Sequence, residues 1–299
     1  MRILVTGISG YVGRHLADTL AAQHHDVRGL ARDPRRVAAP YPVCAVDLAD
    51  GDGLDEALDA IEVAYYLVHS MEGTVDYANA ERQAAERFAQ AAVRAGVRRI
   101  VYMSVLAPLG EHASGHVRSR LAVEQALAAT GVEVVVLRAS IVIGADSRSF
   151  RFLLHLVERL PLLPLPPWRN NRTVPIDERD LLRQLVEAAD APLAASPAIV
   201  DAVGPETVTY HSLIDRISDH LMVRRVVVPI PVAATAIAAP IAAAVSGEDL
   251  GLVAPLMQSL GSDLLARPAD AQGAALGPAR YTLDAAIEHA LRANDDLGD

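Results

Sequence analysis

The stretch Thr6-Gly7-Ile8-Ser9-Gly10-Tyr11-Val12-Gly13 decides the fold, because it lies between a short apolar run, Ile3–Thr6, and an amphipathic segment, Val12–Gln23. Glycines permit a tight turn and let the backbone approach a ligand closely. The free N–H groups and the positive dipole end of the following helix favour a diphosphate. Because the glycines stand between a strand and a helix, they predict a dinucleotide site rather than a merely structural turn.

Around this loop, short β-branched runs alternate with longer amphipathic stretches, which is typical of βαβ units on a parallel sheet. The runs lack strict polar alternation, as expected for strands covered on both faces. We predict an α/β fold, a doubly wound parallel sheet with a smaller, mainly helical C-terminal part. Six strands are expected at Ile3–Thr6, Val27–Leu30, Val43–Val46, Val63–Val68, Ile100–Met103 and Val132–Leu137, with helices at Val12–Gln23, Leu54–Ala60, Val75–Ala95 and Arg118–Ala129.

Beyond Gly144 the pattern loosens, and we predict a cofactor domain at residues 1–145 and, at 146–299, the rest of the sheet plus a substrate or partner subdomain that shares its core. The Pro-rich run Pro161–Pro167 predicts a loop over a cleft. Further expected elements are strands at Thr173–Ile176, Ala198–Val203 and Arg225–Val228, a helix at Leu181–Ala189 with Asp180 as its N-cap, an exposed Asp177–Arg172 pair, and a mainly helical tail in which Pro231–Val245 packs as a helix.

The composition of the 299 residues is 52% hydrophobic and 4% aromatic, which excludes a disordered chain and disfavours a stacking platform for single-stranded nucleic acid. With 37 acidic and 27 basic residues, the net charge of −10 opposes non-specific binding of nucleic acid or anionic lipid. We expect no nucleic-acid partner, no membrane span, no signal peptide and no metal site. The single cysteine, Cys44, fits a reducing compartment, so we expect a cytoplasmic protein.

The Gly-x-x-Gly-x-x-Gly spacing resembles that of the short-chain dehydrogenase/reductase superfamily, especially its extended and atypical branches, which include nucleotide-sugar epimerases and NmrA-like proteins. The resemblance covers roughly residues 1 to 230. It implies a Rossmann fold that binds a nicotinamide dinucleotide. The residues implied at the cofactor are Thr6, Gly7, Ser9, Gly10, Tyr11, Val12 and Gly13 of the loop, Asp47 and Leu48 at the adenine, and Val68, His69 and Ser70 along the dinucleotide. Alternatively, Asp47 only caps a turn and His69 only completes a strand end.

The end of the second strand bears on the choice of cofactor. NAD-preferring sites usually offer Asp or Glu to the ribose 2′-hydroxyl there, whereas this chain offers Arg32, with Arg35 and Arg36 close behind. Bidentate arginine suits a 2′-phosphate, so we predict a preference for NADP(H), with NAD(H) as the alternative. The competing interpretation is a solvated basic loop whose charge pairs with Asp33.

Active members of the superfamily carry Ser or Thr after the fifth strand and Tyr-x-x-x-Lys on the next helix, where the lysine lowers the tyrosine pKa and the tyrosine exchanges a proton with substrate. Here Ser104 fits the first position, whereas His116 replaces the tyrosine and Arg120 the lysine. Arg120 keeps a positive charge, lowers the pKa of His116 and does not release a proton. His116 either supplies an N–H to a carbonyl, acts as an acid when protonated, or merely packs on the helix.

Two further segments extend the resemblance. After the sixth strand, Arg138 is a ligand or a structural anchor, and Ala139, Ser140 and Ile141 are expected beside the nicotinamide. Ser119 and Glu124 match the extended family's helix motif. A loop of Trp168, Arg169, Asn170 and Asn171 is expected on the substrate side.

Three functions remain open. The first hypothesis is an NADP(H)-dependent oxidoreductase that acts on a small apolar carbonyl compound. The second is a non-catalytic NADP(H)-sensing protein that regulates or scaffolds a partner, because the tyrosine and lysine are missing. A nucleotide-sugar epimerase or dehydratase is a weaker third, because such enzymes normally keep the tyrosine.

Overall fold

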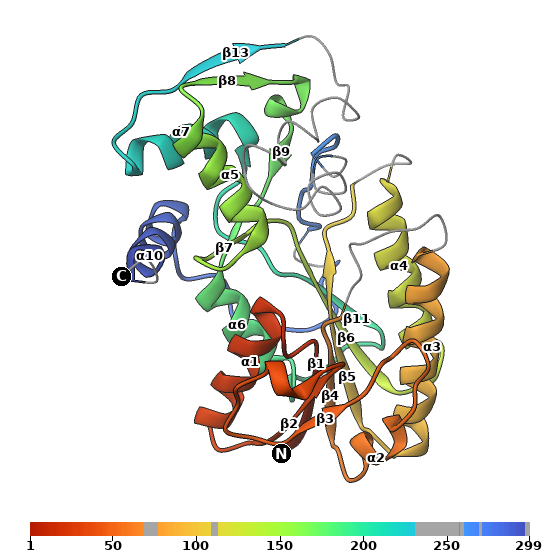
Figure 1. Cartoon of the computed structure of the whole chain (residues 1–299). Helices are drawn as coiled ribbons and strands as arrows, with labels where there is room; N and C mark the ends of the chain where they lie inside the picture. Colours follow the sequence, from red (N-terminus) through yellow and green to blue (C-terminus); the bar gives the residue numbers. More distant parts are fainter. Residues whose placement is uncertain (69–76, 109–112, 231–256, 258–259, 269–270, 297–299) are drawn as a thin grey trace.

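A parallel sheet of seven strands forms the centre of the computed structural model (Figure 1), which describes residues 1–68, 77–108, 113–230, 257, 260–268 and 271–296. The six predicted strands are present, with ends that differ by up to two residues, and a seventh, β11, joins the edge. The order across the sheet is β11 (Ala198–Asp201), β6 (Glu133–Ala139), β5 (Arg99–Val105), β4 (Val63–Tyr66), β1 (Arg2–Thr6), β2 (Asp26–Ala31) and β3 (Val43–Ala45). The direction in which strands are added reverses at β1, which creates a switch point at the carboxyl ends of β1 and β4.

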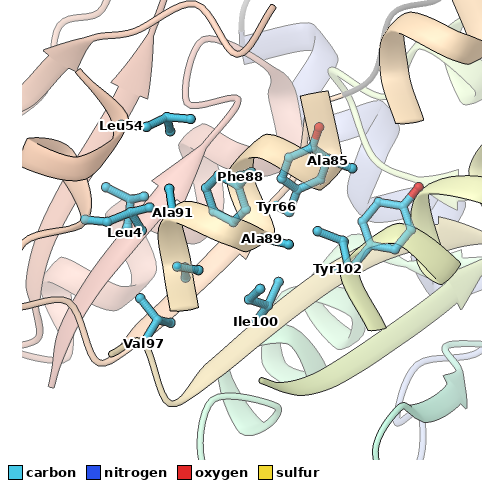
Figure 2. Close-up of a cluster of buried hydrophobic side chains, with 14 of the residues drawn as sticks. Leu4, Leu54, Tyr66, Ala85, Phe88, Ala89, Ala91, Val97, Ile100 and Tyr102 are labelled. Carbon is cyan, nitrogen blue, oxygen red and sulfur yellow. The ribbon is translucent and has the colours of Figure 1, made fainter. Parts of the chain in front are cut away.

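Helices cover both faces of the sheet, because successive strand residues point to opposite sides. On one face, Tyr66 and Tyr102 pack with Phe88 of α3 (Figure 2), and the Tyr66 and Phe88 rings meet edge to face at 5.0 Å between centroids. On the other face, Val5 and Val101 pack against α1 and α6. The first face is covered by α2 (Leu54–Leu58), α3 (Tyr77–Arg94) and α4 (Gly115–Ala128), and the second by α1 (Tyr11–Ala22) and α6 (Glu178–Glu187).

The C-terminal part has its own hydrophobic core, in which Phe150, Tyr210 and Ile287 are buried. Of the described helices, α5 (Arg148–Arg159), α7 (Tyr210–His220) and α10 (Leu283–Asp296) contribute to this core. Around them lie strand pairs β7 (Val142–Ile143) with β10 (Ile176–Asp177), β9 (Arg172–Thr173) with β12 (Val208–Thr209), and β8 (Leu162–Leu165) with β13 (Val226–Pro229). Short 3-10 turns occur at η1 (Pro34–Arg36) and η2 (Pro167–Asn170). The division of the chain at residue 145 stays a prediction.

The prediction of a loop at Pro161–Pro167 is wrong. Most of that run is β8, which pairs in parallel with β13 so that Pro164 lies opposite Val228. Proline is tolerated here because a strand with a single partner can turn its missing N–H away from that partner.

Two expectations for Asp177 and Asp180 are also wrong. Asp177 is the N-cap of α6 and accepts the N–H of Arg179, whereas Asp180 lies inside the helix. Asp177 is buried and pairs with Arg179, while Arg172 pairs with Asp263 instead.

Among the described residues, no helix has both the length and the apolar character needed to cross a bilayer. The predicted packing helix Pro231–Val245 lies outside the described residues.

Candidate functional site

The glycine loop is a tight turn at the carboxyl end of β1. Gly7 has φ of +66°, a conformation that L side chains rarely adopt, and its carbonyl oxygen accepts the N–H of Gly10 at 2.9 Å. A Cβ at Gly13 would lie 2.3 Å from the same oxygen, so only glycine lets α1 approach the turn this closely. Thr6 Oγ1 accepts the N–H of Leu67 at 2.9 Å, which joins the loop to the end of β4.

The start of α1 is open to a ligand. Its N-cap, Gly10, is exposed, no side chain of the described residues caps the helix, and the first turn holds no acidic residue. Ser9, immediately before the cap, is also exposed. The first N–H groups of a helix need partners, and together with the helix dipole they favour an anion. The residues present therefore fit the diphosphate of a dinucleotide.

Tyr11, the first residue of α1, has a partner that sequence reasoning missed. Its hydroxyl donates to Glu178, 167 residues away along the chain, and the other carboxylate oxygen of Glu178 lies 3.2 Å from Nε2 of His289 on α10. Burial and the neighbouring Glu178 raise the pKa of Tyr11 well above its ordinary value. No local motif signals this contact, because its members come from three distant helices. Val12, the next residue, is half-buried and packs against the sheet.

The arginines after β2 divide into two kinds. Arg35 donates from Nε to Asp33 at 2.9 Å, and Arg36 lies 3.7 Å from the same carboxylate. These two side chains match the interpretation of a solvated loop paired with Asp33. Arg32 is exposed and forms no ion pair with another described residue, so it is the one of the three that stays available to a phosphate.

The other residues expected along the cofactor lie near the same edge of the sheet. Asp47 is exposed and accepts the N–H of Ala49 at 2.9 Å, which is the turn-capping role, while Leu48 and Val68 are half-buried against the α2–α4 face. His69 and Ser70 lie outside the described residues. Beyond β6, Ala139 is buried in the sheet core and Ser140 donates to the carbonyl of Val174 at 2.8 Å, with Ile141 buried in the C-terminal core.

Ser104 belongs to a buried hydrogen-bonded network between β5, α4 and β6. Its hydroxyl donates to Glu124 at 2.6 Å, and Arg138 donates to both carboxylate oxygens of Glu124, at 3.1 and 2.6 Å. Ser104 and Glu124 are buried, and the Arg138 side chain is 13% exposed. The Ser104 proton is thus already donated, which leaves the hydroxyl only acceptor capacity. Arg138 is an anchor in this network.

The Arg120 side chain is buried and contacts the end of β5. Its Nη2 donates to the carbonyl of Met103, its guanidinium lies 5.0 Å from the centroid of the Tyr102 ring, and its Nε has no hydrogen-bond partner among the described residues. The Tyr102 phenol is no replacement for the missing tyrosine, because burial raises its pKa to about 12.

His116 lies one helical turn before Arg120 and is buried. Burial, and secondarily the positive charge of Arg120, lowers its pKa to about 4. The direction expected from Arg120 is correct, but burial is the larger cause. His116 is therefore a neutral imidazole near pH 7, which can donate one N–H but is not a protonated acid.

The loop expected on the substrate side is fixed to the C-terminal part. Trp168 packs against the C-terminal core and meets Tyr210 edge to face at 5.9 Å, and Asn171 donates to the carbonyl of Leu260 at 2.6 Å. Contact of this loop with a substrate stays a prediction.

Comparison with known proteins shows that the chain is similar to several of them. Residues 3–172 match the model of the NAD dependent epimerase/dehydratase family. An uncharacterized protein of Mycobacterium tuberculosis is 30% identical over 204 residues, which are 68% of this chain and 20% of that relative. The ceramide reductase of Caulobacter vibrioides is 28% identical over 198 residues, 64% of this chain and 62% of that protein. The chain thus spans about a fifth of the first relative and less than two thirds of the second.

The UDP-glucose 4-epimerase of Thermotoga maritima is similar in structure, with a TM-score of 0.77 at 13% identity over 100% of both chains. This likeness shows a shared Rossmann-like fold.

Proposed function

The chain belongs to the NAD dependent epimerase/dehydratase family, and we propose that it is an NADP(H)-dependent oxidoreductase that acts on a small apolar carbonyl compound. The observation that carries the proposal is the uncapped, glycine-lined start of α1 at the switch point of the sheet. When bound, the dinucleotide supplies hydride donation and acceptance. The name of the Caulobacter relative, ceramide reductase, supports a reductase with an apolar substrate.

The residues of this chain divide the work of binding. The N–H groups at the start of α1 hold the diphosphate. Gly7 and Gly13 lack side chains, so the backbone of the loop lets the diphosphate come close to α1. Arg32, exposed after β2, binds the 2′-phosphate, which is the basis for preferring NADP(H) over NAD(H).

At the reacting end, His116 holds a neutral N–H for the oxygen of the substrate carbonyl. A neutral imidazole stabilises a developing oxyanion by hydrogen bonding without itself being an acid, so the proton that completes the product alcohol comes from solvent water. Arg120 adds a fixed positive charge close by, although its bond to Met103 keeps the guanidinium turned inward.

A second function is favoured by that same inward position of Arg120. With no tyrosine–lysine pair and with the Ser104 hydroxyl donated to Glu124, the described residues of the site provide no proton relay of the usual kind. A non-catalytic NADP(H)-sensing protein that controls a partner is the consistent alternative. A nucleotide-sugar epimerase, the activity named for the structurally similar Thermotoga protein, stays the weaker third candidate.

Binding of NADPH and NADH to purified protein tests the cofactor assignment. We expect Ser9→Glu, which places a negative charge beside the exposed N-cap, to weaken both by about a hundredfold, and the neutral, equally long Ser9→Gln to weaken them far less. Arg32→Ala should lower affinity for NADPH about tenfold and leave NADH unchanged. Arg94→Ala removes an exposed arginine of α3 paired with Asp55 and is the matched control. Failure of wild-type protein to bind either nucleotide overturns the proposal.

Hydride transfer decides between enzyme and sensor. Wild-type protein is assayed for oxidation of NADPH with a panel of carbonyl compounds and quinones, and His116→Ala is expected to lower turnover at least about tenfold. Unchanged turnover in His116→Ala removes this residue from the reaction. Tight binding with no turnover across the panel supports the sensor instead.

A further inference from the structure

The paired strands β8 and β13 expose Leu162, Val226 and Val228, and Met222 protrudes after the end of α7, four residues before β13. These four side chains together are here called the apolar ribbon face. Their exposed fractions are 57%, 59%, 40% and 92%. Leu162 lies opposite Val226 in the strand register, and the intervening Leu163 and Val227 turn inward to the C-terminal core. Of the six large hydrophobic side chains exposed in the described part of the chain, four lie on this face.

Met222 protrudes from an unusual backbone position. It follows the C-cap of α7 with φ of +54°, where its N–H bonds to the carbonyl of Asp219 and the N–H of Val223 to that of Ser218. Glycine is the common residue at this place in a helix C-terminus, because other residues are strained there. Met222 is therefore disfavoured in two ways, because its backbone conformation is strained for a residue with a Cβ and its apolar side chain is exposed to solvent.

The two segments of sequence that contain β8 and β13 carry a net positive charge, opposite in sign to that of the chain. Residues 158–171 and 219–230 contain four arginines, Arg159, Arg169, Arg224 and Arg225, and two acidic residues, Glu158 and Asp219, in a chain with a net charge of −10. Arg224 is exposed. Arg225 donates to the carbonyl oxygens of Val157 and Glu158, and it forms no ion pair with any residue in the described part of the chain.

We propose that the apolar ribbon face docks the protein peripherally on an anionic lipid surface. Such a surface can bind both kinds of side chain, because its acyl layer accepts the four apolar side chains and its anionic headgroups attract the arginines. Two copies that met ribbon to ribbon would bring like charges together, which disfavours self-association. β8 and β13 lie at the end of the molecule away from β2 and β3 (Figure 1). The inference goes beyond the dinucleotide site and does not depend on it.

Co-sedimentation of the full chain with vesicles tests the docking surface. The vesicles are phosphatidylcholine alone or phosphatidylcholine with phosphatidylglycerol at about 3 to 1. We expect binding to the anionic vesicles only, weakened at least about tenfold by Met222→Asp with Val226→Asp and also by Arg224→Gln. Val93→Asp alters an exposed valine of α3, away from the ribbon, and is expected to bind like wild type.

Several outcomes overturn the docking surface. These are no binding of wild type to either vesicle, equal binding of the double variant, or a wild-type dimer in light scattering that the double variant dissociates. The last result would make the ribbon an interface between copies. Nucleotide affinity of the double variant should match wild type, so failure of the cofactor assignment and failure of lipid docking are separable.

Discussion

At the residue scale, His116 makes stability depend on pH. Its pKa is about 6.5 in an unfolded chain and about 4 in the folded protein. Between these values the unfolded chain binds a proton that the folded protein does not, so the free energy of unfolding falls as pH drops from about 6.5 to about 4. The loss from this group is on the order of 3 kcal/mol and does not grow below pH 4.

Chemical denaturation of wild type and His116→Gln at several values between pH 7.5 and 4.5 checks this prediction, since glutamine does not titrate. The wild-type curve should fall more steeply over that range. Parallel curves for the two proteins would mean that His116 is not neutral and buried in the folded state.

Residues whose role is local could be predicted from the sequence, and those with distant partners could not. Gly7 and Gly13 are required by the turn that they themselves form. Asp180 has the features of an N-cap, but its carboxylate accepts hydrogen bonds from the backbone N–H groups of Arg280 and Tyr281, at 2.7 and 3.0 Å. These partners lie 100 and 101 residues away along the chain. The actual cap, Asp177, lies one turn earlier.

At the scale of elements, the ion pair between Glu124 and Arg138 connects α4 to β6. Glu124→Gln keeps the shape of the side chain but leaves the buried Arg138 guanidinium without a counter-charge, which should cost on the order of 3 kcal/mol in unfolding free energy. Ser104→Ala removes one hydrogen bond and should cost about 1 kcal/mol. Urea denaturation measures both, and Glu124→Leu with Arg138→Leu should recover much of the loss. A double variant that is less stable than Glu124→Gln would contradict this prediction, because it would show that the ion pair adds more to the unfolding free energy than the neutralisation of two buried charges.

The central elements follow from the sequence because each strand is a short apolar run followed by its own helix. The strand β8 does not, because its prolines obscure it and its partner β13 comes some 60 residues later. The inward position of Arg120 likewise depends on Met103 and Tyr102 of a neighbouring strand. Pairing information of that kind is not contained in local periodicity.

At the scale of the whole molecule, Tyr11, Glu178 and His289 connect the glycine loop, α6 and the C-terminal helix α10. Glu178→Gln removes the charge that both neighbours face, so α10 should open about tenfold more often. Hydrogen exchange of amides in residues 286–290 measures this opening. Glu288→Gln on the same helix breaks only an exposed pair with Arg292 and is the matched control. Equal exchange in both variants would show that Glu178 does not hold α10.

The net acidity of the chain correctly describes its average but not the distribution of its charge. The lipid docking proposed above rests on a local excess of arginine over acidic residues, which the net charge of −10 does not show. The excess depends on the pairing of β8 with β13, which brings residues 162–165 beside 226–229. A sum over the sequence carries no such spatial information.

The placement of α10 has a consequence for synthesis of the protein. Strands β1 to β6 can pair as soon as the first 139 residues have emerged, whereas the C-terminal core needs Leu283, Ala286, Ile287 and Ala290 beside the much earlier Phe150. Because a chain emerges from the ribosome N-terminus first, α5 and α7 present uncovered apolar surface until α10 has been translated. During that interval a nascent chain with a formed sheet still exposes apolar surface that is prone to aggregate.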